Sequence, residues 1–399
     1  MSAPGPNIWE VPSRTPVPPR PIAAGDVVAA FSDALGEWTA AQITSLDPAS
    51  KTAAVLELDW SGPEPSSTAD LGDVSALRLT HHSWGGQPSH CNHEWVLPRG
   101  CKMIGTLPLL GAERTGAYAS GWRLGEQLAR QRHWDGGDRA DWVDPHAMSG
   151  TGAEIDQILD GPAEPQRHIR SLSVTQIKAL DCARLVERYP GLTRLRLWGD
   201  MGLLSRASSL NELTSLRSLL ISDLFGMSAS DRLLPRHVPA LESVFLHSIP
   251  AEYATAMRST WRPETPNGTY LHIAAARRPE WVAENQANPL RDWDGREHIG
   301  KTSYKKALAL YKSTRRAVLA ALSEGPADER PGRLSEIGRR YGEGFNELDA
   351  RTSFIETVER EELFSALDFI VTEAEGTLGQ NLAWARESLA SGVESVREW

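Results

Sequence analysis

One segment has the spacing of a phosphate-binding loop. Gly295-Arg-Glu-His-Ile-Gly300-Lys301-Thr302 matches G-x-x-x-x-G-K-[S/T], and residues of helical period follow it. In a phosphate loop, backbone N–H groups between a buried strand and a helix surround the phosphates. The preceding residues 285–294 are polar and contain Pro289, which does not favour a buried strand. The context favours a loop with Thr302 or Ser303 as helix N-cap, and a nucleotide-binding enzyme or switch is the alternative.

A second group of residues has the chemistry of metal ligands. It consists of His81, His82, His90, Cys91, His93 and Cys101. The chain has no C-x-x-C pair, and His90-x-x-His93 with Cys101 does not have the spacing of common zinc sites. We therefore expect structural histidines, with no metal and no cofactor.

No nucleophile with a matching base is evident. The chain lacks the patterns G-x-S-x-G, H-E-x-x-H and G-x-G-x-x-G. Glu356, Glu359 and Glu362 follow one another at i, i+3 spacing, but no His follows them at the offset that metal-binding bundles use. That helix face is expected to be solvated or paired with Arg351 and Arg360. No catalytic residue is predicted, and the expected protein is not an enzyme.

The overall composition narrows the functional classes. The 399 residues carry a net charge of -10, which argues against broad binding to nucleic acids or anionic membranes. Three cysteines are too few, and odd in number, for a disulfide framework, so a reducing cytoplasm fits best. No apolar run is long enough to span a membrane, and residues 1–20 lack the apolar core of a signal peptide.

Five segments between Ile169 and Ile273 share one apolar spacing. They read apolar-x-x-apolar-x-apolar, with Gly268 as an exception, and are I169-R-S-L-S-V174, L192-T-R-L-R-L197, L216-R-S-L-L-I221, L241-E-S-V-F-L246 and G268-T-Y-L-H-I273. Their starts lie 23, 24, 25 and 27 residues apart. A short strand that repeats at this period cannot bury its apolar face alone, so neighbouring repeats are expected to stack.

The pattern resembles that of leucine-rich repeat proteins. The resemblance covers residues 166–290 and implies an α/β solenoid with helical returns between strands. The family's Asn ladder is largely absent, because its positions hold Ile177, Asp200, Leu224 and Ile249. The resemblance implies a binding surface on the inner sheet and supplies no catalytic group.

Residues that flank the last apolar positions of each strand are expected to point out of the inner sheet. They form a basic and aromatic strip, here named the inner-face strip, of Arg194, Arg196, Trp198, Leu220, Phe245, His247, Tyr270 and His272. Arg, Trp, Tyr and Phe are enriched at binding hot spots. We expect this strip to bind a protein partner, or to be covered by the connector or the C-terminal bundle.

Short alternating segments precede the repeats. They are G25-D-V-V-A-A30, E37-W-T-A-A-Q-I43, L56-E-L-D-W-S-G62 and A76-L-R-L79. Their order is similar to that of Tudor-like, SH3-type barrels, which implies a small antiparallel barrel with an extension over residues 23–110. The resemblance also implies an aromatic cage for a methylated lysine or arginine, formed by Phe31, Trp38 and Trp60. The other interpretation of Trp38 and Trp60 is barrel core or cover.

The remaining segments complete a multi-domain α+β prediction. Residues 1–22 contain seven prolines and predict a disordered Pro-rich arm, residues 111–165 a connector that caps the repeats, and residues 291–399 an α-helical bundle. The predicted order is therefore a small antiparallel β-barrel, a leucine-rich-repeat α/β solenoid and a C-terminal α-helical bundle. The expected function is a non-enzymatic, cytoplasmic scaffold or adaptor that binds a protein partner through the concave face, the barrel or both.

Overall fold

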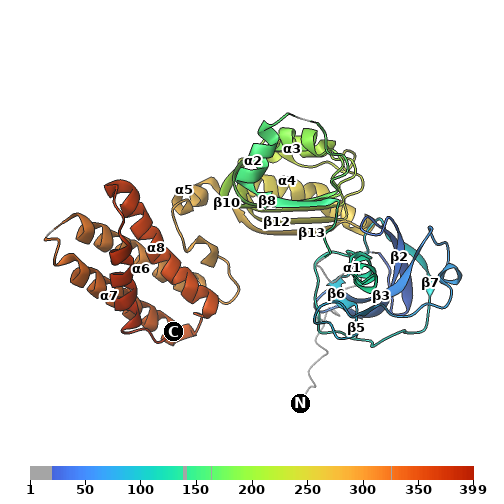
Figure 1. The fold of residues 1–399 in the computed structure, drawn as a ribbon, viewed down its shortest axis with the longest axis horizontal. Coiled ribbons are helices and arrows are strands. Elements are labelled where there is room, and N and C mark those ends of the chain that lie inside the picture. Colours follow the sequence, from blue (N-terminus) through green and yellow to red (C-terminus); the bar gives the residue numbers. More distant parts are fainter. Residues whose placement is uncertain (1–19, 138–141, 163, 325) are drawn as a thin grey trace, which may run out of the picture. The chain divides into compact units, whose positions relative to one another are not determined.

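The computed structural model describes residues 20–137, 142–162, 164–324 and 326–399, so the predicted Pro-rich arm lies almost wholly outside the described residues. The chain divides into two compact units, Met1–Pro279 and Glu280–Trp399. The predicted α+β class is confirmed in three respects: an antiparallel sheet, a parallel sheet and C-terminal helices follow one another along the chain (Figure 1). In the described part of the chain, no helix is long and apolar enough to cross a membrane.

The first unit begins with a five-stranded antiparallel sheet. Its strands are β1 (Asp26–Ser32), β2 (Glu37–Asp47), β3 (Thr52–Gly62), β6 (His90–Glu94) and β7 (Lys102–Thr106), in the order β6-β3-β2-β1-β7. Strands β1 to β3 contain the first three alternating segments of the sequence. Their side chains are buried in two separate apolar clusters, one around Val28 and Ile43 and the other around Val27 and Leu58.

The fourth alternating segment, residues 76–79, does not form a strand of the five-stranded sheet, although the sequence predicted one. Of residues 76–79, only β4 (Arg78–Leu79) is a strand, and it pairs with β5 (Gln87–Pro88) in a separate two-stranded sheet. The short 3-10 helix η1 (Thr68–Leu71) precedes it. The five-stranded sheet is completed instead by β6 and β7. Strand β6 is polar in sequence, and its backbone pairs with the edge of β3, which an apolar pattern does not reveal.

The second sheet of the first unit has six parallel strands. They are β8 (Ala147–Thr151), β9 (Ser171–Asp181), β10 (Arg194–Ser205), β11 (Ser218–Phe225), β12 (Ser243–Pro250) and β13 (Tyr270–Arg277), and they are neighbours in chain order. The five repeated segments therefore form one parallel ladder, as predicted. The register aligns Leu195 with Leu219 and Leu219 with Val244, and all three side chains are fully buried.

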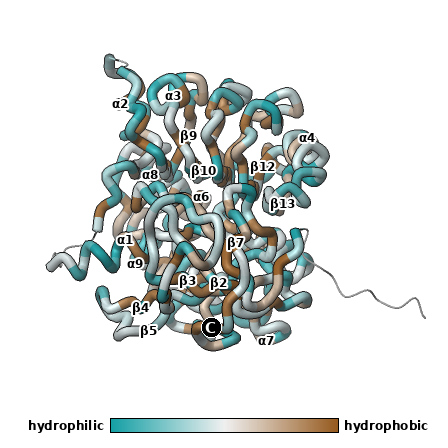
Figure 2. Tube along the Cα trace, turned by 90° about the vertical axis from the view of Figure 1, so that its right-hand side faces the viewer, coloured by the Kyte–Doolittle hydropathy of each residue, from teal (hydrophilic) through white to brown (hydrophobic). Residues whose placement is uncertain are grey.

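Helical segments return the chain from each strand to the next. They are α2 (Gly152–Asp160), α3 (Cys182–Arg188), η2 (Ala207–Glu212), η3 (Ala229–Asp231), α4 (Ala251–Trp261) and η4 (Arg262–Asn267). Figure 1 shows α2, α3 and α4 on one face of the parallel sheet, while the other face is directed toward α1 (Glu126–Asp135) and the antiparallel strands. Hydrophobic residues recur along β9, β10 and β12 (Figure 2), because alternate side chains of these strands pack against the returns.

A left-handed bend recurs part-way along the repeated strands. It falls at Gln176, Met201, Asp223, Ser248 and Ala275, whose φ angles are 53°, 55°, 51°, 48° and 49°. The carboxylate of Asp223 accepts hydrogen bonds from Met201 N at 2.8 Å and from Ser248 Oγ at 3.1 Å. Asp223 thus links the bends of three neighbouring strands, although no Asn ladder is present.

The predicted connector contributes more ordered structure than its composition indicated. Besides α1, it contains β8 and α2, and β8 pairs with β9 at the edge of the parallel sheet. The sequence of β8, Ala-Met-Ser-Gly-Thr, has no apolar alternation, so its strand was not predicted. Thr151 begins α2 with a capping box, in which Thr151 N donates to Glu154 Oε2 at 2.7 Å and Glu154 N donates to Thr151 Oγ1 at 3.3 Å.

The described secondary structure of the second unit is helical. After α5 (Pro279–Asn285) and η5 (Arg291–Trp293) come α6 (Lys301–Ser323), α7 (Arg330–Thr352), α8 (Thr357–Leu378) and α9 (Ala383–Glu394). Trp293 lies in their core, with its ring centroid 6.2 Å from that of Phe345 and 5.7 Å from that of Phe354. Helices α7 and α9 approach closely at glycines, because a Cβ on Gly338 would lie 2.2 Å from the carbonyl oxygen of Leu389.

Candidate binding cleft

Parallel register arranges the inner-face strip in rows. One row contains Ser171, Arg194, Ser218, Ser243 and Tyr270, the next contains Ser173, Arg196, Leu220, Phe245 and His272, and a third contains Trp198, Ser222, His247 and Ala274. These side chains alternate along each strand with the buried leucines, so they lie on the face opposite the helical returns. The structure therefore brings all eight predicted partner-binding residues onto one face of one sheet.

A cleft of about 320 Å³ is lined both by this face and by residues of the N-terminal part of the chain. Six residues of the inner-face strip line it: Arg194, Arg196, Trp198, Leu220, Phe245 and Tyr270. His247 and His272 do not line the cleft, and both are exposed. The facing wall includes Phe31 and Asp33, at the end of β1 and in the turn after it, and Trp122, Arg123 and Glu126 before and at the start of α1.

The cover of the inner-face strip was only partly predicted. The expected cover is the connector or the C-terminal bundle, whereas the antiparallel sheet contributes here together with residues of the connector. Tyr270 packs against the apolar cluster of that sheet, which contains Val28, Ile43 and Val96. Burial, followed by the charge of Glu94, raises the pKa of the Tyr270 phenol. Tyr270 is thus engaged by a contact within the chain.

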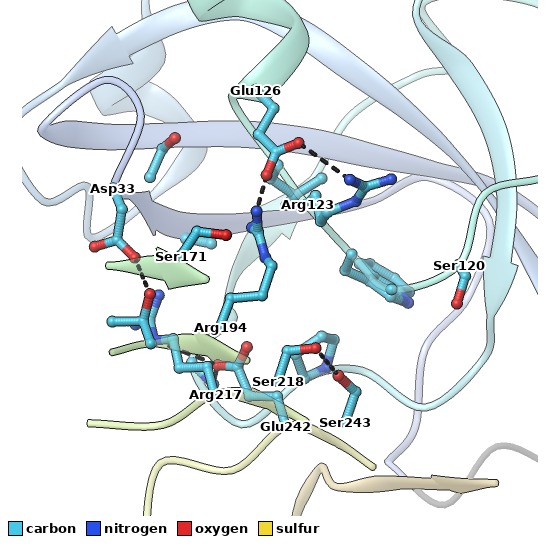
Figure 3. A pocket seen from close by; sticks show the side chains of 18 of the residues that line it. Asp33, Ser120, Arg123, Glu126, Ser171, Arg194, Arg217, Ser218, Glu242 and Ser243 are labelled. Atoms are coloured by element: carbon cyan, nitrogen blue, oxygen red, sulfur yellow. Dashed lines mark hydrogen bonds and ion pairs between the residues drawn. The ribbon is translucent and has the colours of Figure 1, made fainter. Parts of the chain in front are cut away.

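An ion-paired network bridges the two walls of the cleft. Figure 3 shows Glu126 between two arginines: its Oε1 lies 2.6 Å from the guanidinium of Arg194, and its Oε2 lies 3.5 Å from that of Arg123. Thr193 Oγ1 also donates to Asp33 Oδ2 at 3.1 Å. These contacts join residues that are far apart in the sequence, so they could not be predicted from spacing.

Arg196 differs from the other arginines of the cleft. It is half-buried, and among the described residues it has no hydrogen-bond or ion-pair partner. Burial lowers the pKa of its guanidinium, and the positive charges of Arg123 and Arg194 lower it further, while Glu126 acts in the opposite direction. The guanidinium remains charged, because an arginine pKa is far above neutral pH. An anion placed beside Arg196 would therefore gain a favourable interaction that the chain itself does not provide.

Glu242 lies at the base of the cleft and holds a loop of the antiparallel region. Gly100 N donates to its Oε1 at 3.0 Å, and the same oxygen lies 4.0 Å from Arg217 Nε. Burial raises the pKa of the Glu242 carboxyl, and Asp33 adds to this, although Arg217, Gly100 and Arg99 act against it. The residues of the cleft that sequence reasoning missed are mainly Glu126, Arg123, Trp122 and Glu242. None of them belongs to a repeated pattern.

The exceptional Gly268 of the fifth repeat has a structural reason. Its φ is 94°, and a Cβ there would lie 2.6 Å from Arg99 N and 2.8 Å from Leu97 O. The loop at Arg99 docks on this repeat: Arg99 N donates to Gly268 O at 3.1 Å, and Arg99 Nη1 donates to Pro239 O at 2.7 Å. A larger residue at position 268 would displace this loop, whose Pro98 and Gly100 line the cleft.

The three residues of the predicted aromatic cage have different environments. Phe31 and Trp38 face each other across β1 and β2, with ring centroids 6.4 Å apart, and Phe31 also lines the cleft. Trp38 and Trp60 pack against the apolar cluster around Val27 and Leu58. The ammonium of Lys102 lies 4.9 Å from the Trp38 ring centroid, so the chain already supplies a cation to this ring.

The histidines and cysteines of residues 81–101 lie in several separate environments. His90 Nε2 lies 2.8 Å from Thr44 Oγ1, and burial lowers the pKa of His93 to about 4. Burial raises the pKa of the Cys101 thiol far above its usual range. Within residues 20–137, 142–162, 164–324 and 326–399, no group of three or more His, Cys, Asp or Glu is arranged to hold a metal ion.

The segment with the phosphate-loop spacing lacks a strand before it. η5 precedes it, and Gly300 is the N-cap of α6, in place of the predicted Thr302 or Ser303. Arg296 pairs with Glu359 and with Glu362, the latter at 2.7 Å. The expected alternatives were a solvated face or pairing with Arg351 and Arg360, whereas Glu359 is buried and both carboxylates pair with Arg296. Two carboxylates beside the loop oppose the binding of a phosphate group. Nothing in this geometry favours the nucleotide-binding alternative.

Comparisons with known proteins give no match: no family model, no curated protein and no solved structure is significantly similar to this chain.

Proposed function

We propose that this protein is a non-enzymatic recognition scaffold that holds a segment of a partner protein in the cleft. In this proposal the repeats are a leucine-rich-repeat solenoid, and the antiparallel sheet is a Tudor-like, SH3-type barrel that forms the facing wall. One observation carries the proposal. The cleft combines Arg196, which has no partner in the described part of the chain, with Trp198, Phe245 and Trp122, and these residue types dominate the energy of protein interfaces.

The chemistry of the cleft favours binding over catalysis. Its described lining contains no histidine, and its cysteine, Cys101, is buried with a raised thiol pKa that disfavours the thiolate. The hydroxyls of Ser218 and Ser243 bond to each other at 2.9 Å, and neither hydroxyl is bonded to a basic side chain among the described residues. A nucleophile needs an adjacent base or a lowered pKa, and these groups have neither.

Site-specific photo-crosslinking tests the proposal. A benzophenone amino acid at position 245 would report what occupies the cleft in cells, and the same amino acid at Tyr118 would serve as the control. Tyr118 is 72% exposed and does not line the cleft. We expect a discrete crosslinked protein from position 245, absent from position 118 and lost when Arg196→Gln is added. The proposal fails if position 245 yields no protein adduct, or if both positions yield the same adducts.

A further inference from the structure

We propose that the segment held in the cleft presents a single carboxylate to Arg196 and, three residues away, an apolar side chain to Leu220 and Phe245. This inference rests on the function proposed above and specifies the chemistry of the partner. It follows from the charge balance of the cleft, from the one cleft arginine that has no partner among the residues that the structure describes, and from the register of the strands.

The charge balance of the lining disfavours a doubly negative ligand. Five arginines line the cleft (Arg123, Arg170, Arg194, Arg196 and Arg217), together with five carboxylates (Asp33, Glu94, Glu126, Asp144 and Glu242). The formal charge of the lining is therefore zero, from five positive and five negative groups. A phosphate monoester would bring nearly two negative charges among five carboxylates. A carboxylate brings one, which suits a lining without excess positive charge.

Arg196 is the arginine available for that carboxylate. Arg123 and Arg194 share Glu126, Arg217 lies beside Glu242, and Arg170 donates to Gly191 O at 3.1 Å. Among the described residues, only Arg196 of the five has neither a carboxylate nor a hydrogen-bond acceptor. A guanidinium can bind a carboxylate through two parallel N–H···O bonds, which fixes the orientation of the ligand as well as its charge.

The register places an apolar platform at a defined distance from Arg196. Arg196 is aligned with Leu220, and Leu220 with Phe245, on the neighbouring strands β10, β11 and β12. Adjacent strands are about 4.8 Å apart, so Arg196 and Phe245 are about 10 Å apart across the sheet. The Phe245 ring is supported by Tyr270, with centroids 5.3 Å apart, and by His272, with centroids 5.9 Å apart.

This distance determines the spacing within the bound segment. In a β-strand, residues three apart point to opposite faces, but a polyproline II segment repeats its facing every three residues. It advances about 3.1 Å per residue, so about 10 Å corresponds to three residues on one face of such a segment. A segment crossing from β10 to β12 would therefore carry Asp or Glu at one position and a large apolar residue three positions away. Either order along the chain satisfies this spacing, because both chain directions across the strands give the same separation.

Peptide selection on the full-length protein tests the spacing. A phage-displayed library of random 12-residue peptides would be selected on the wild-type chain, and the enriched peptides would be synthesised for fluorescence-anisotropy titration. We expect enrichment of an acidic and an apolar residue three positions apart. Arg196→Gln should weaken binding about 10- to 100-fold, as expected for a lost hydrogen bond to a charged group. Arg130→Gln, an exposed arginine of α1 outside the cleft, is the control.

The partner's carboxylate is tested from the peptide side. Glu→Gln (or Asp→Asn) in the peptide should cause the same loss as Arg196→Gln, and the two changes together should cause little more than either alone. This arm is independent of how Arg196 variants fold. Peptides that need Phe245 but contain no acidic residue, or that bind better with phosphoserine in its place, would overturn this inference and leave the recognition function intact. Absence of both peptide binding and crosslinked protein would overturn both proposals.

Discussion

Arg194 and Arg196 lie two residues apart on the same strand and have opposite roles. Arg194 is bonded to Glu126 across the cleft, whereas Arg196 has no partner among the described residues and is opposed by two neighbouring cations. Sequence alone treats them as equivalent members of one strip. The difference arises from Glu126, which is distant in the chain and is positioned by the first turn of α1.

These two arginines should differ in their effect on stability. Arg194→Gln should lower the free energy of unfolding of the first unit by about 1 kcal/mol, since it removes a partly buried charged hydrogen bond and partial exposure reduces its value. Arg196→Gln should leave stability unchanged or raise it slightly, because it removes like-charge repulsion. Urea unfolding monitored by tryptophan fluorescence would measure both. A larger loss for Arg196→Gln than for Arg194→Gln would contradict the pairing.

Glu57 should make stability depend on pH. Its buried carboxylate accepts Gly125 N at 2.8 Å and Ser89 Oγ at 2.7 Å, and burial raises its pKa above the ordinary range. The folded state therefore binds a proton more tightly than the unfolded state, whose Glu pKa is about 4.3. The contribution of Glu57 to the free energy of unfolding is largest below the unfolded pKa of about 4.3, and it is lost as the pH rises through the pKa of the folded state. Glu57→Gln should flatten this decline, measured by unfolding at pH 4 to 8.

A matched substitution isolates the effect of burial at Glu57. Glu187→Gln changes an exposed carboxylate of α3 and should leave the pH profile of the wild type unaltered. If Glu57→Gln gave the wild-type pH profile as well, the Glu57 carboxylate would not be the source of the decline.

At the scale of elements, the leucine spacing was sufficient to predict the parallel ladder. Leu195, Leu219 and Val244 were expected to be stacked and are aligned and fully buried. Strand β8 is not predicted from the sequence, because Ala-Met-Ser-Gly-Thr has no alternation of apolar and polar residues. Strand β6 is not predicted either, because its residues are polar and only its backbone pairs with β3. The walls of the cleft could not be predicted, because they depend on contacts between segments that are distant in the sequence. Spacing reveals local periodicity and gives no information on such contacts.

Truncation within the parallel ladder should be costly. Leu219→Ala should lower the free energy of unfolding by about 2–5 kcal/mol, from lost burial and a residual cavity. Leu203→Ala on β10 is the matched control, because that side chain is 55% exposed, and it should cost much less. Hydrogen exchange of the β11 backbone would locate the loss. Equal effects of the two substitutions would contradict the assigned core.

The start of α6 should not respond to nucleotides. Lys301 is exposed in the first turn of α6, and Arg296 of the preceding loop pairs with Glu359 and Glu362. Lys301→Ala should leave thermal stability and any response to ATP or GTP unchanged. A nucleotide thermal-shift series on both proteins would measure this. Saturable micromolar binding that disappears in Lys301→Ala would restore the enzyme alternative.

At the scale of the molecule, the second unit has a core of its own. Trp293, Phe345 and Phe354 pack among helices that belong to Glu280–Trp399. We therefore expect residues 279–399, produced alone, to unfold cooperatively on heating and to show the near-ultraviolet circular dichroism of fixed aromatic rings. A fragment with helical far-ultraviolet but no near-ultraviolet signal would be a molten globule and would contradict an independent core.

Gly268 and the Arg99 loop also bear on how the number of repeats can change. Stacked arrays commonly tolerate gain or loss of a unit, because each unit contacts only its neighbours. Here the loop at Leu97–Arg99 contacts the fifth repeat at Gly268. Glu126 of the same wall binds Arg194 on β10, three strands away from β13. Insertion of one unit between β10 and β13 would move these two anchoring points about 4.8 Å further apart. The facing wall is anchored at both points, so the number of strands between β10 and β13 cannot change without the loss of one of these contacts.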